Sequence, residues 1–157
     1  IIELSSAPVF VGVGGGTTTG QRSVDIALSA ELMGAYGVVL NAPTKNQLIS
    51  EMKERLDIPI IITIVSEMED FEARIKAGAS IFNVSGGANT VKIVKQIREK
   101  HPNFPIIATG GPTSESILET IKAGANTVTY TPPTTGDLFS EMMDKYRKQV
   151  LENTENN

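Results

Sequence analysis

Glycine pairs followed by small polar side chains are the residues in this chain that could bind an anion. The run Ala108-Thr109-Gly110-Gly111-Pro112-Thr113 joins a predicted strand to a predicted helix. Paired glycines let the main chain approach a ligand closely, and the first amides of a helix attract negative charge such as a phosphate. Thr109, Gly110 and Gly111 therefore predict a phosphate site. The alternative is a tight strand-to-helix turn.

Two further segments could complete that site. Ser85, Gly86 and Gly87 follow the preceding predicted strand, and they would either line the same anion or form an ordinary turn. Thr131 and Thr134 lie in the run after the last predicted strand and are expected to supply the other wall. In barrels of parallel strands, the loops after the last two strands commonly hold phosphate.

A longer glycine-rich run, Gly14–Gly20, follows the first predicted strand. It predicts a lid or a second phosphate contact, with Arg22 as a possible counter-charge. A mobile surface loop is the alternative, because a glycine-rich run by itself is weak evidence of a ligand site.

Acid–base chemistry has two candidate residues, Glu67 and Lys45, each just beyond a predicted strand. A carboxylate and an ammonium across one pocket could move protons next to a carbonyl. Asn41 and Asn83 stand at matching strand ends and could bind the oxygens of a polar ligand. The alternatives are a solvated acid in a helix first turn for Glu67, a surface position for Lys45, and strand termination for both asparagines.

Two other polar residues are expected to be structural. Tyr130 is expected to pack in the core near the end of the last strand, and His101 to be a solvated residue at a helix end before Pro102. Because His101 is the only histidine and the chain has no cysteine, no metal site is predicted.

An internal repeat places these residues. The strand opening at 58–63 recurs at 104–109, and Lys76-Ala77-Gly78-Ala79 recurs at 122–125 with the same offset. Repetition of this kind indicates a repeated strand–helix unit, because one unit cannot bury its own apolar face. Six apolar, β-branched runs are predicted to be parallel strands: 9–13, 37–41, 59–65, 80–84, 105–109 and 127–131.

Alternating strands and helices fit an α/β fold, either a closed (β/α)8 TIM-type barrel or an open doubly wound sheet. The regular repeat favours the barrel. Six strands are two fewer than a barrel needs, so six β/α units are expected here with the first two missing from the amino end. The domain is expected to span 1–151, followed by a disordered tail at 152–157.

Composition narrows the classes of function. The net charge is −4, which argues against a nucleic-acid partner. The absence of cysteine excludes disulfides and a thiolate nucleophile, and cytoplasmic residence is the default expectation. Apolar runs are strand-sized, so no membrane association is expected. Open strand edges lead us to expect a homo-oligomer.

The chain resembles the phosphate-binding (β/α)8 barrel superfamily, and most closely in pattern the keto-deoxy-phosphogluconate aldolases. Similar Lys-Ala-Gly-Ala and Thr-Gly-Gly patterns occur in inosine monophosphate dehydrogenases and hexosamine-phosphate epimerases. The residues that carry the likeness are Ile58-Pro59-Ile60, Ser66-Glu67, Ile81-Phe82-Asn83, Gly86-Gly87 and Ala108-Thr109-Gly110-Gly111. Asn83 stands where the aldolases carry a Schiff-base lysine, and the cysteine nucleophile of the dehydrogenases has no counterpart here.

The expected function is an enzyme that acts on a small phosphorylated metabolite, a sugar phosphate or a keto acid. Lyase or isomerase chemistry of an aldolase or epimerase kind is expected, without metal and without a cofactor. Flavin mononucleotide bound through its phosphate at Gly110 and Gly111 is a minor possibility that the superfamily allows. The alternative function is a module of the same fold that senses a phosphometabolite without turnover.

Overall fold

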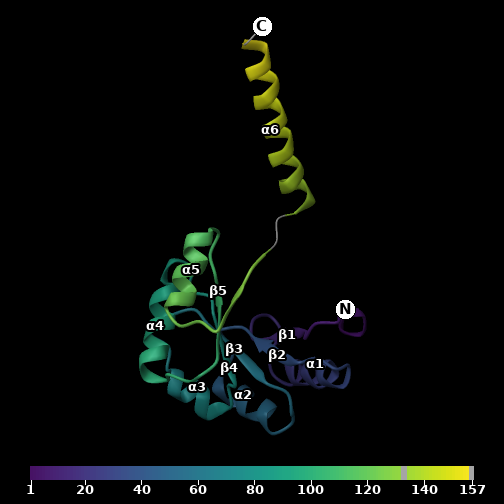
Figure 1. Ribbon diagram of the computed structural model, residues 1–157. Helices are drawn as coiled ribbons and strands as arrows, with labels where there is room; N and C mark the ends of the chain where they lie inside the picture. The colour runs from purple at the N-terminus through teal and green to yellow at the C-terminus, as the bar shows by residue number, and fades with distance from the viewer. Residues whose placement is uncertain (132–133, 156–157) are drawn as a thin grey trace.

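The computed structural model describes residues 1–131 and 134–155. They form a curled parallel sheet with helices on its outer side and a carboxyl-terminal helix that extends away from it (Figure 1). The strands are β1 Phe10–Gly14, β2 Gly37–Leu40, β3 Ile60–Ile64, β4 Ile81–Val84, β5 Ile106–Thr109 and β6 Thr127–Thr129. The helices are α1 Gln21–Leu32, α2 Asn46–Lys53, α3 Phe71–Ala77, α4 Thr90–Lys100, α5 Ser114–Lys122 and α6 Thr135–Glu155, with the 3-10 turns η1 Ile2–Leu4 and η2 Gly87–Asn89.

The strand order confirms the barrel-type arrangement. Neighbouring strands follow one another in sequence, from β1 through to β6, and every pair is parallel. A doubly wound sheet would instead reverse its strand order at a switch point. All six predicted strands are present, each within two residues of its expected limits.

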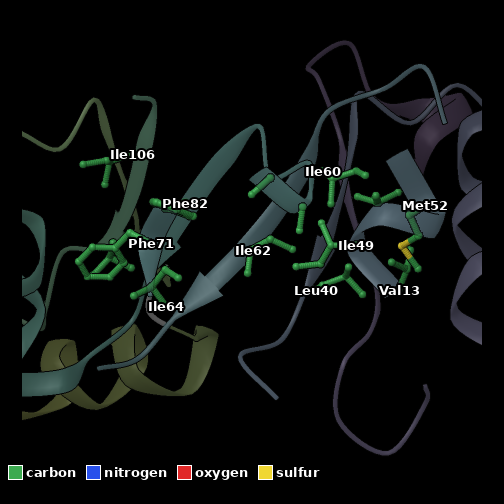
Figure 2. Close-up of a cluster of buried hydrophobic side chains, with 14 of the residues drawn as sticks. Val13, Leu40, Ile49, Met52, Ile60, Ile62, Ile64, Phe71, Phe82 and Ile106 are labelled. Carbon is green, nitrogen blue, oxygen red and sulfur yellow. The ribbon is translucent and has the colours of Figure 1, made fainter. Parts of the chain in front are cut away.

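Side chains alternate between the two faces of the sheet, and the outward face carries the core. Leu40, Ile62 and Phe82 occupy neighbouring strands and pack against the helices, together with Ile49 on α2 and Phe71 on α3 (Figure 2). These side chains are 0–2% exposed. The intervening residues of each strand face the concave inner side, so the inner side holds whatever site the strand ends form.

The amino ends of the strands form the base of the sheet, where Arg98 links several main-chain segments through hydrogen bonds. Arg98 at the end of α4 donates hydrogen bonds to the carbonyls of Phe104, Pro102 and Gly124, at 2.8, 2.7 and 2.7 Å, and to the Asn126 side chain at 2.8 Å. Asn126 Oδ1 also accepts from Ile106 N at 2.9 Å. Gly124 has a φ of +111° beside the Arg98 side chain, and a Cβ there would meet Arg98 Cγ at 2.8 Å.

The start of α3 bears on the alternative that Glu67 is a solvated acid in a helix first turn. Helix α3 begins at Phe71, where the Asp70 side chain accepts from Ala73 N. The preceding segment is a loop, because the Glu69 side chain accepts from Val65 N at 3.0 Å. Glu67 therefore does not lie in the first turn of a helix.

The carboxyl-terminal helix stands apart from the sheet. Helix α6 extends away from the other elements (Figure 1). Its exposed apolar side chains include Leu138, Phe139 and Met142. It continues to Glu155, so the first part of the expected tail is helical, and residues 156–157 lie outside the described residues. Tyr130, expected in the core, is 63% exposed. Among the described residues, no helix is both long and apolar enough to cross a membrane.

Candidate functional site

The inner face at the carboxyl ends of the strands is lined by uncharged polar side chains. Thr63 on β3 and Asn83 on β4 are register partners, and Asn83 Nδ2 donates to Thr63 Oγ1 at 3.3 Å. One step further along, Thr109 Oγ1 donates to Ser85 Oγ at 3.1 Å. Thr129 on β6 is the register partner of Thr109. The fold thus places the predicted residues Asn83, Ser85 and Thr109 at one rim.

The Gly110–Gly111 segment is a closely packed turn between β5 and α5. A Cβ on Gly110 would lie 2.8 Å from Ile117 Cγ1, and one on Gly111 would lie 2.6 Å from Ser116 Oγ. Gly111 also has a φ of +79°, which favours glycine. A tight strand-to-helix turn, the alternative to a phosphate site, therefore explains both glycines. Because Gly111 is exposed, the same turn still leaves room for a ligand beside it.

Helix α5 is partly capped by its own side chains. Thr113 Oγ1 accepts from Ser116 N at 3.2 Å, while Ser116 Oγ accepts from Thr113 N at 3.1 Å. This reciprocal arrangement satisfies two donors that an anion would otherwise use. The amides of Ser114 and Glu115 are left without an intrahelical partner, as in any helix first turn.

A cleft of about 410 Å³ lies beside this turn. Its walls are the start of α4 and the first turns of α5, and Glu119 is the ionisable side chain among its lining residues: Gly87, Ala88, Thr90, Val91, Thr109, Gly110, Gly111, Pro112, Ser116, Glu119 and Thr120. A ligand here would be held by main-chain groups and hydroxyls.

The two glycines of the second pair, Gly86 and Gly87, differ in their surroundings: Gly86 is closely packed and Gly87 faces open space. A Cβ on Gly86 would clash with Ile93 Cδ1, and Gly86 N donates to Thr90 Oγ1 at 3.1 Å. Gly87 has a φ of +58° and faces open space, since a Cβ there would meet nothing within 4 Å. Of this pair, Gly87 is the member that leaves its main chain accessible beside the rim.

Glu67 is paired with a cation that sequence reasoning missed. Lys92 Nζ on α4 lies 2.6 Å from Glu67 Oε2, and Gln96 Nε2 donates to the Glu67 carbonyl at 3.2 Å. No motif signals Lys92, because it is one lysine among several on an amphipathic helix and is close to Glu67 only in the folded chain. The pair stands beyond the ends of β3 and β4.

Lys45 occupies a different place. It is the residue before α2 and lines a second cleft of about 380 Å³, together with Thr19, Gly20 and Glu51. Within the described part of the chain, no hydrogen bond or ion pair joins Lys45 to Glu67. Asn41 is exposed at the end of β2. The assignment of Lys45 and Glu67 as a catalytic pair stays a prediction that these contacts do not support.

The expected second wall after β6 has hydrogen bonds of its own at the start of α6. Thr134 donates from its amide and its hydroxyl to Asp137 Oδ2, at 2.9 and 2.6 Å. These hydrogen bonds hold the pKa of Asp137 below its usual value of 3.8. Thr131 is exposed, and residues 132–133 of this predicted wall lie outside the described residues.

The remaining ionisable residues do not form a metal centre in the described ranges. No group of three or more histidine, cysteine or carboxylate side chains could hold an ion there. His101 follows the last residue of α4, as predicted, but its side chain is 19% exposed and not fully solvated, with Nε2 3.8 Å from Glu72 Oε2.

Comparison with known proteins gives matches in structure and none in sequence. No family model matches the chain, and no curated protein does. A solved mandelate oxidase mutant with a monooxide FMN adduct superposes with a TM-score of 0.67 and 17% identity, over 80% of this chain and 48% of that one. The inosine 5′-monophosphate dehydrogenase of Legionella pneumophila gives 0.65 and 18%, over 80% and 43%. The chain therefore spans about half the length of these proteins.

These comparisons correct two expectations. The expectation of a metal-independent lyase or isomerase acting on a phosphometabolite, with a sensor of such metabolites as its alternative, was wrong, because the matching solved structures include an oxidase and a dehydrogenase. The absence of a cofactor was also wrong, because the matching oxidase carries an FMN adduct.

The likeness to inosine monophosphate dehydrogenases is confirmed at the level of fold, whereas phosphate binding and the likeness to aldolases stay predictions. At these identities the likeness establishes the fold, which is that of a TIM barrel over six parallel β/α units.

Proposed function

We propose that this chain is the flavin-binding portion of an FMN-dependent TIM-barrel oxidoreductase. The observation that carries the proposal is the neutral polar rim on the concave face, in a fold shared with an FMN-bearing oxidase. Flavin would supply two-electron transfer, a chemistry that the protein's own side chains lack. The residues of this chain would bind and orient it.

The rim suits the ring system of a flavin. Amide and hydroxyl groups of Asn83, Thr63, Ser85 and Thr109 can both donate and accept, and a flavin ring offers uncharged carbonyl and ring-nitrogen partners. Gly12 on β1 leaves the inner face open, since a Cβ there would meet nothing within 4 Å. A flat ring can approach such a surface, because neither charge nor bulk stands in its way.

The phosphate of the cofactor would be held at the start of α5. The exposed Gly111 and the free amides of Ser114 and Glu115 offer main-chain donors at the positive end of the helix dipole. Glu119 lines the same cleft and opposes an anion. We therefore expect the ring contacts, rather than the phosphate alone, to supply much of the affinity.

Flavin binding is tested by titrating the purified chain into FMN and following quenching of flavin fluorescence. We expect saturable quenching, with Ser85→Ala and Thr109→Val each weakening the affinity about two- to tenfold, the range for one lost hydrogen bond. Ser50→Ala on α2 removes a hydroxyl from an exposed position away from the rim and serves as the matched control.

Riboflavin separates the two parts of the proposed site. It lacks the phosphate, so weaker binding than FMN would support the α5 cradle, and equal binding would show that the phosphate contributes nothing there. Absence of saturable quenching by either flavin would overturn the proposed function.

A further inference from the structure

We propose that α6 is a self-association surface, which pairs antiparallel with α6 of a second copy of this chain. The helix runs from Thr135 to Glu155 and extends away from the sheet and the other helices (Figure 1). A lone helix of this length is marginally stable in water, because helices in proteins draw most of their stability from packing of an apolar face. Helix α6 therefore needs a surface on which to pack.

One face of α6 is apolar and exposed. Leu138, Phe139, Met142 and Tyr146 follow one another at spacings that place them along one line of the helix, and we call these four residues the α6 stripe. Their exposed fractions lie between 53% and 63%. In the sequence the same line continues to Val150. A stripe of this kind is typical of a helix that packs against another helix.

Charged residues accompany the stripe and are ordered by sign. From 137 to 148 the acidic residues come first and the basic residues follow: Asp137, Glu141, Asp144, Lys145, Arg147 and Lys148. Glu141 and Lys148 are seven residues, or two helical turns, apart and so lie on the same flank of the stripe. In the part of the chain that the structure describes, neither of them has an ion-pair partner, whereas Asp144 and Arg147 pair with each other at 2.7 Å.

This order of charges favours antiparallel over parallel pairing. Glu141 and Lys148 are equally distant from a centre between residues 144 and 145, which is also the middle of the apolar stretch 138–150. Two antiparallel copies that cross at this centre bring Glu141 of each copy opposite Lys148 of the other. Parallel copies would instead place each of these residues opposite its own counterpart, where like charges repel.

The chain's own sheet is a poorer partner for the stripe. Strand β6 has three residues, of which Val128 is the apolar one. Helix α5, which precedes β6, exposes Leu118 and Ile121, by 56% and 41%. These few side chains are fewer than the stripe needs, whereas a second α6 offers a stripe of equal length. We therefore assign the stripe to a second copy.

Sedimentation velocity of the full chain without flavin, over concentrations of about 1–300 μM, measures this association. We expect a reversible dimer with a dissociation constant on the order of 10–100 μM, because the stripe is smaller than the roughly 20 residues a side of a stable interface. Met142→Gln should weaken the dimer about tenfold or more, since it buries an amide without a partner. Leu151→Gln is the matched control: Leu151 is 64% exposed but follows Asp144 by seven residues, on the charged side of the helix.

Charge reversal tests the direction of pairing. Glu141→Lys and Lys148→Glu should each weaken the dimer about three- to tenfold at low salt, because each variant turns two attractive pairs into repulsive ones. The double variant should restore the original affinity, since the same pairs form with their signs exchanged. Net charge alone would move the two single variants in opposite directions, and a parallel dimer predicts no restoration.

The proposal is overturned if the chain stays monomeric throughout this range, or if Met142→Gln and Leu151→Gln weaken association equally. A dimer that Met142→Gln leaves intact would place the contact elsewhere, such as the apolar cleft of about 500 Å³ beside β1 and α1. A monomer whose thermal midpoint falls with Met142→Gln would show that α6 packs on its own sheet. Because no flavin is present in these measurements, the dimer and the proposed flavin site can fail separately.

Discussion

At β4 and β5, the two ends of the parallel strands use polar side chains in opposite ways. At the base, Arg98 directs its guanidinium to main-chain carbonyls and to Asn126, and Glu31 accepts from the amides of Asp57 and Ile58. At the rim, Ser85 and Thr109 bond mainly to each other, at 3.1 Å, beside open space. At these two strands, charge at the base serves stability, and the Ser85–Thr109 part of the rim keeps uncharged groups available to a ligand; after β2, by contrast, Arg74 donates to the main-chain carbonyls of Ala42 and Thr44. Barrels of this type divide stability and activity between their ends in the same way.

Removing the Arg98 hydrogen bonds at the base should have the largest effect on stability. Arg98→Met removes hydrogen bonds that satisfy several partly buried carbonyls, and we expect the free energy of unfolding to fall by about 3 kcal/mol. Urea unfolding followed by circular dichroism measures it. Arg55→Met, which loses one exposed pair to Glu51 at 3.7 Å, should change stability by less than about 1 kcal/mol. Equal effects of the two variants would show that the base does not have the role assigned to it.

The Gly110–Gly111 turn lies at the rim, but its close packing should make it important for stability. It therefore sharpens the comparison between the two ends. Gly110→Ala would place a Cβ 2.8 Å from Ile117 Cγ1 and 3.3 Å from Val128 Cβ, and we expect this overpacking to cost about 1–3 kcal/mol. Gly12→Ala meets nothing within 4 Å and serves as the control, with an expected change of less than about 1 kcal/mol. A shift of the thermal midpoint with Gly12→Ala as large as with Gly110→Ala would contradict this interpretation of the turn.

The hydroxyls of the rim should matter little to stability. Ser85→Ala is expected to change the free energy of unfolding by less than about 0.5 kcal/mol, because the Ser85 side chain is exposed and bonds only to a neighbouring hydroxyl. The same urea experiment checks this expectation. A loss comparable with that of Arg98→Met would mean that the rim is part of the structural framework.

The smallest expected effect is the response of α6 to acid. Hydrogen bonds from Thr134 lower the pKa of Asp137, so their contribution is complete above the usual value of 3.8 and is lost as the pH falls through the lower folded value. The Thr134 amide shift should follow a titration with a midpoint below 3.8. Asp137→Asn should abolish that titration, and a midpoint at or above 3.8 would contradict the contact.

The sequence predicts the sheet well because its signals are local. Continuous apolar runs mark all six strands, and paired landmarks such as Lys76-Ala77-Gly78-Ala79 and 122–125 mark where α3 and α5 end. The helix-first-turn alternative for Glu67 fails because Ser66 and Asp70 are both suitable caps, and only tertiary contacts decide between them. Sequence could not reveal the Lys92–Glu67 pair or the unpartnered Thr44 hydroxyl, since both depend on segments that meet only after folding.

The consecutive order of the strands has a consequence for synthesis. Each strand from β2 onward pairs with the one translated just before it, so the nascent chain needs no distant segment to extend the sheet. The protein can therefore fold during synthesis one β/α unit at a time, with each new unit packing on the unit before it. Stalled chains should therefore become resistant to protease in steps that match whole units.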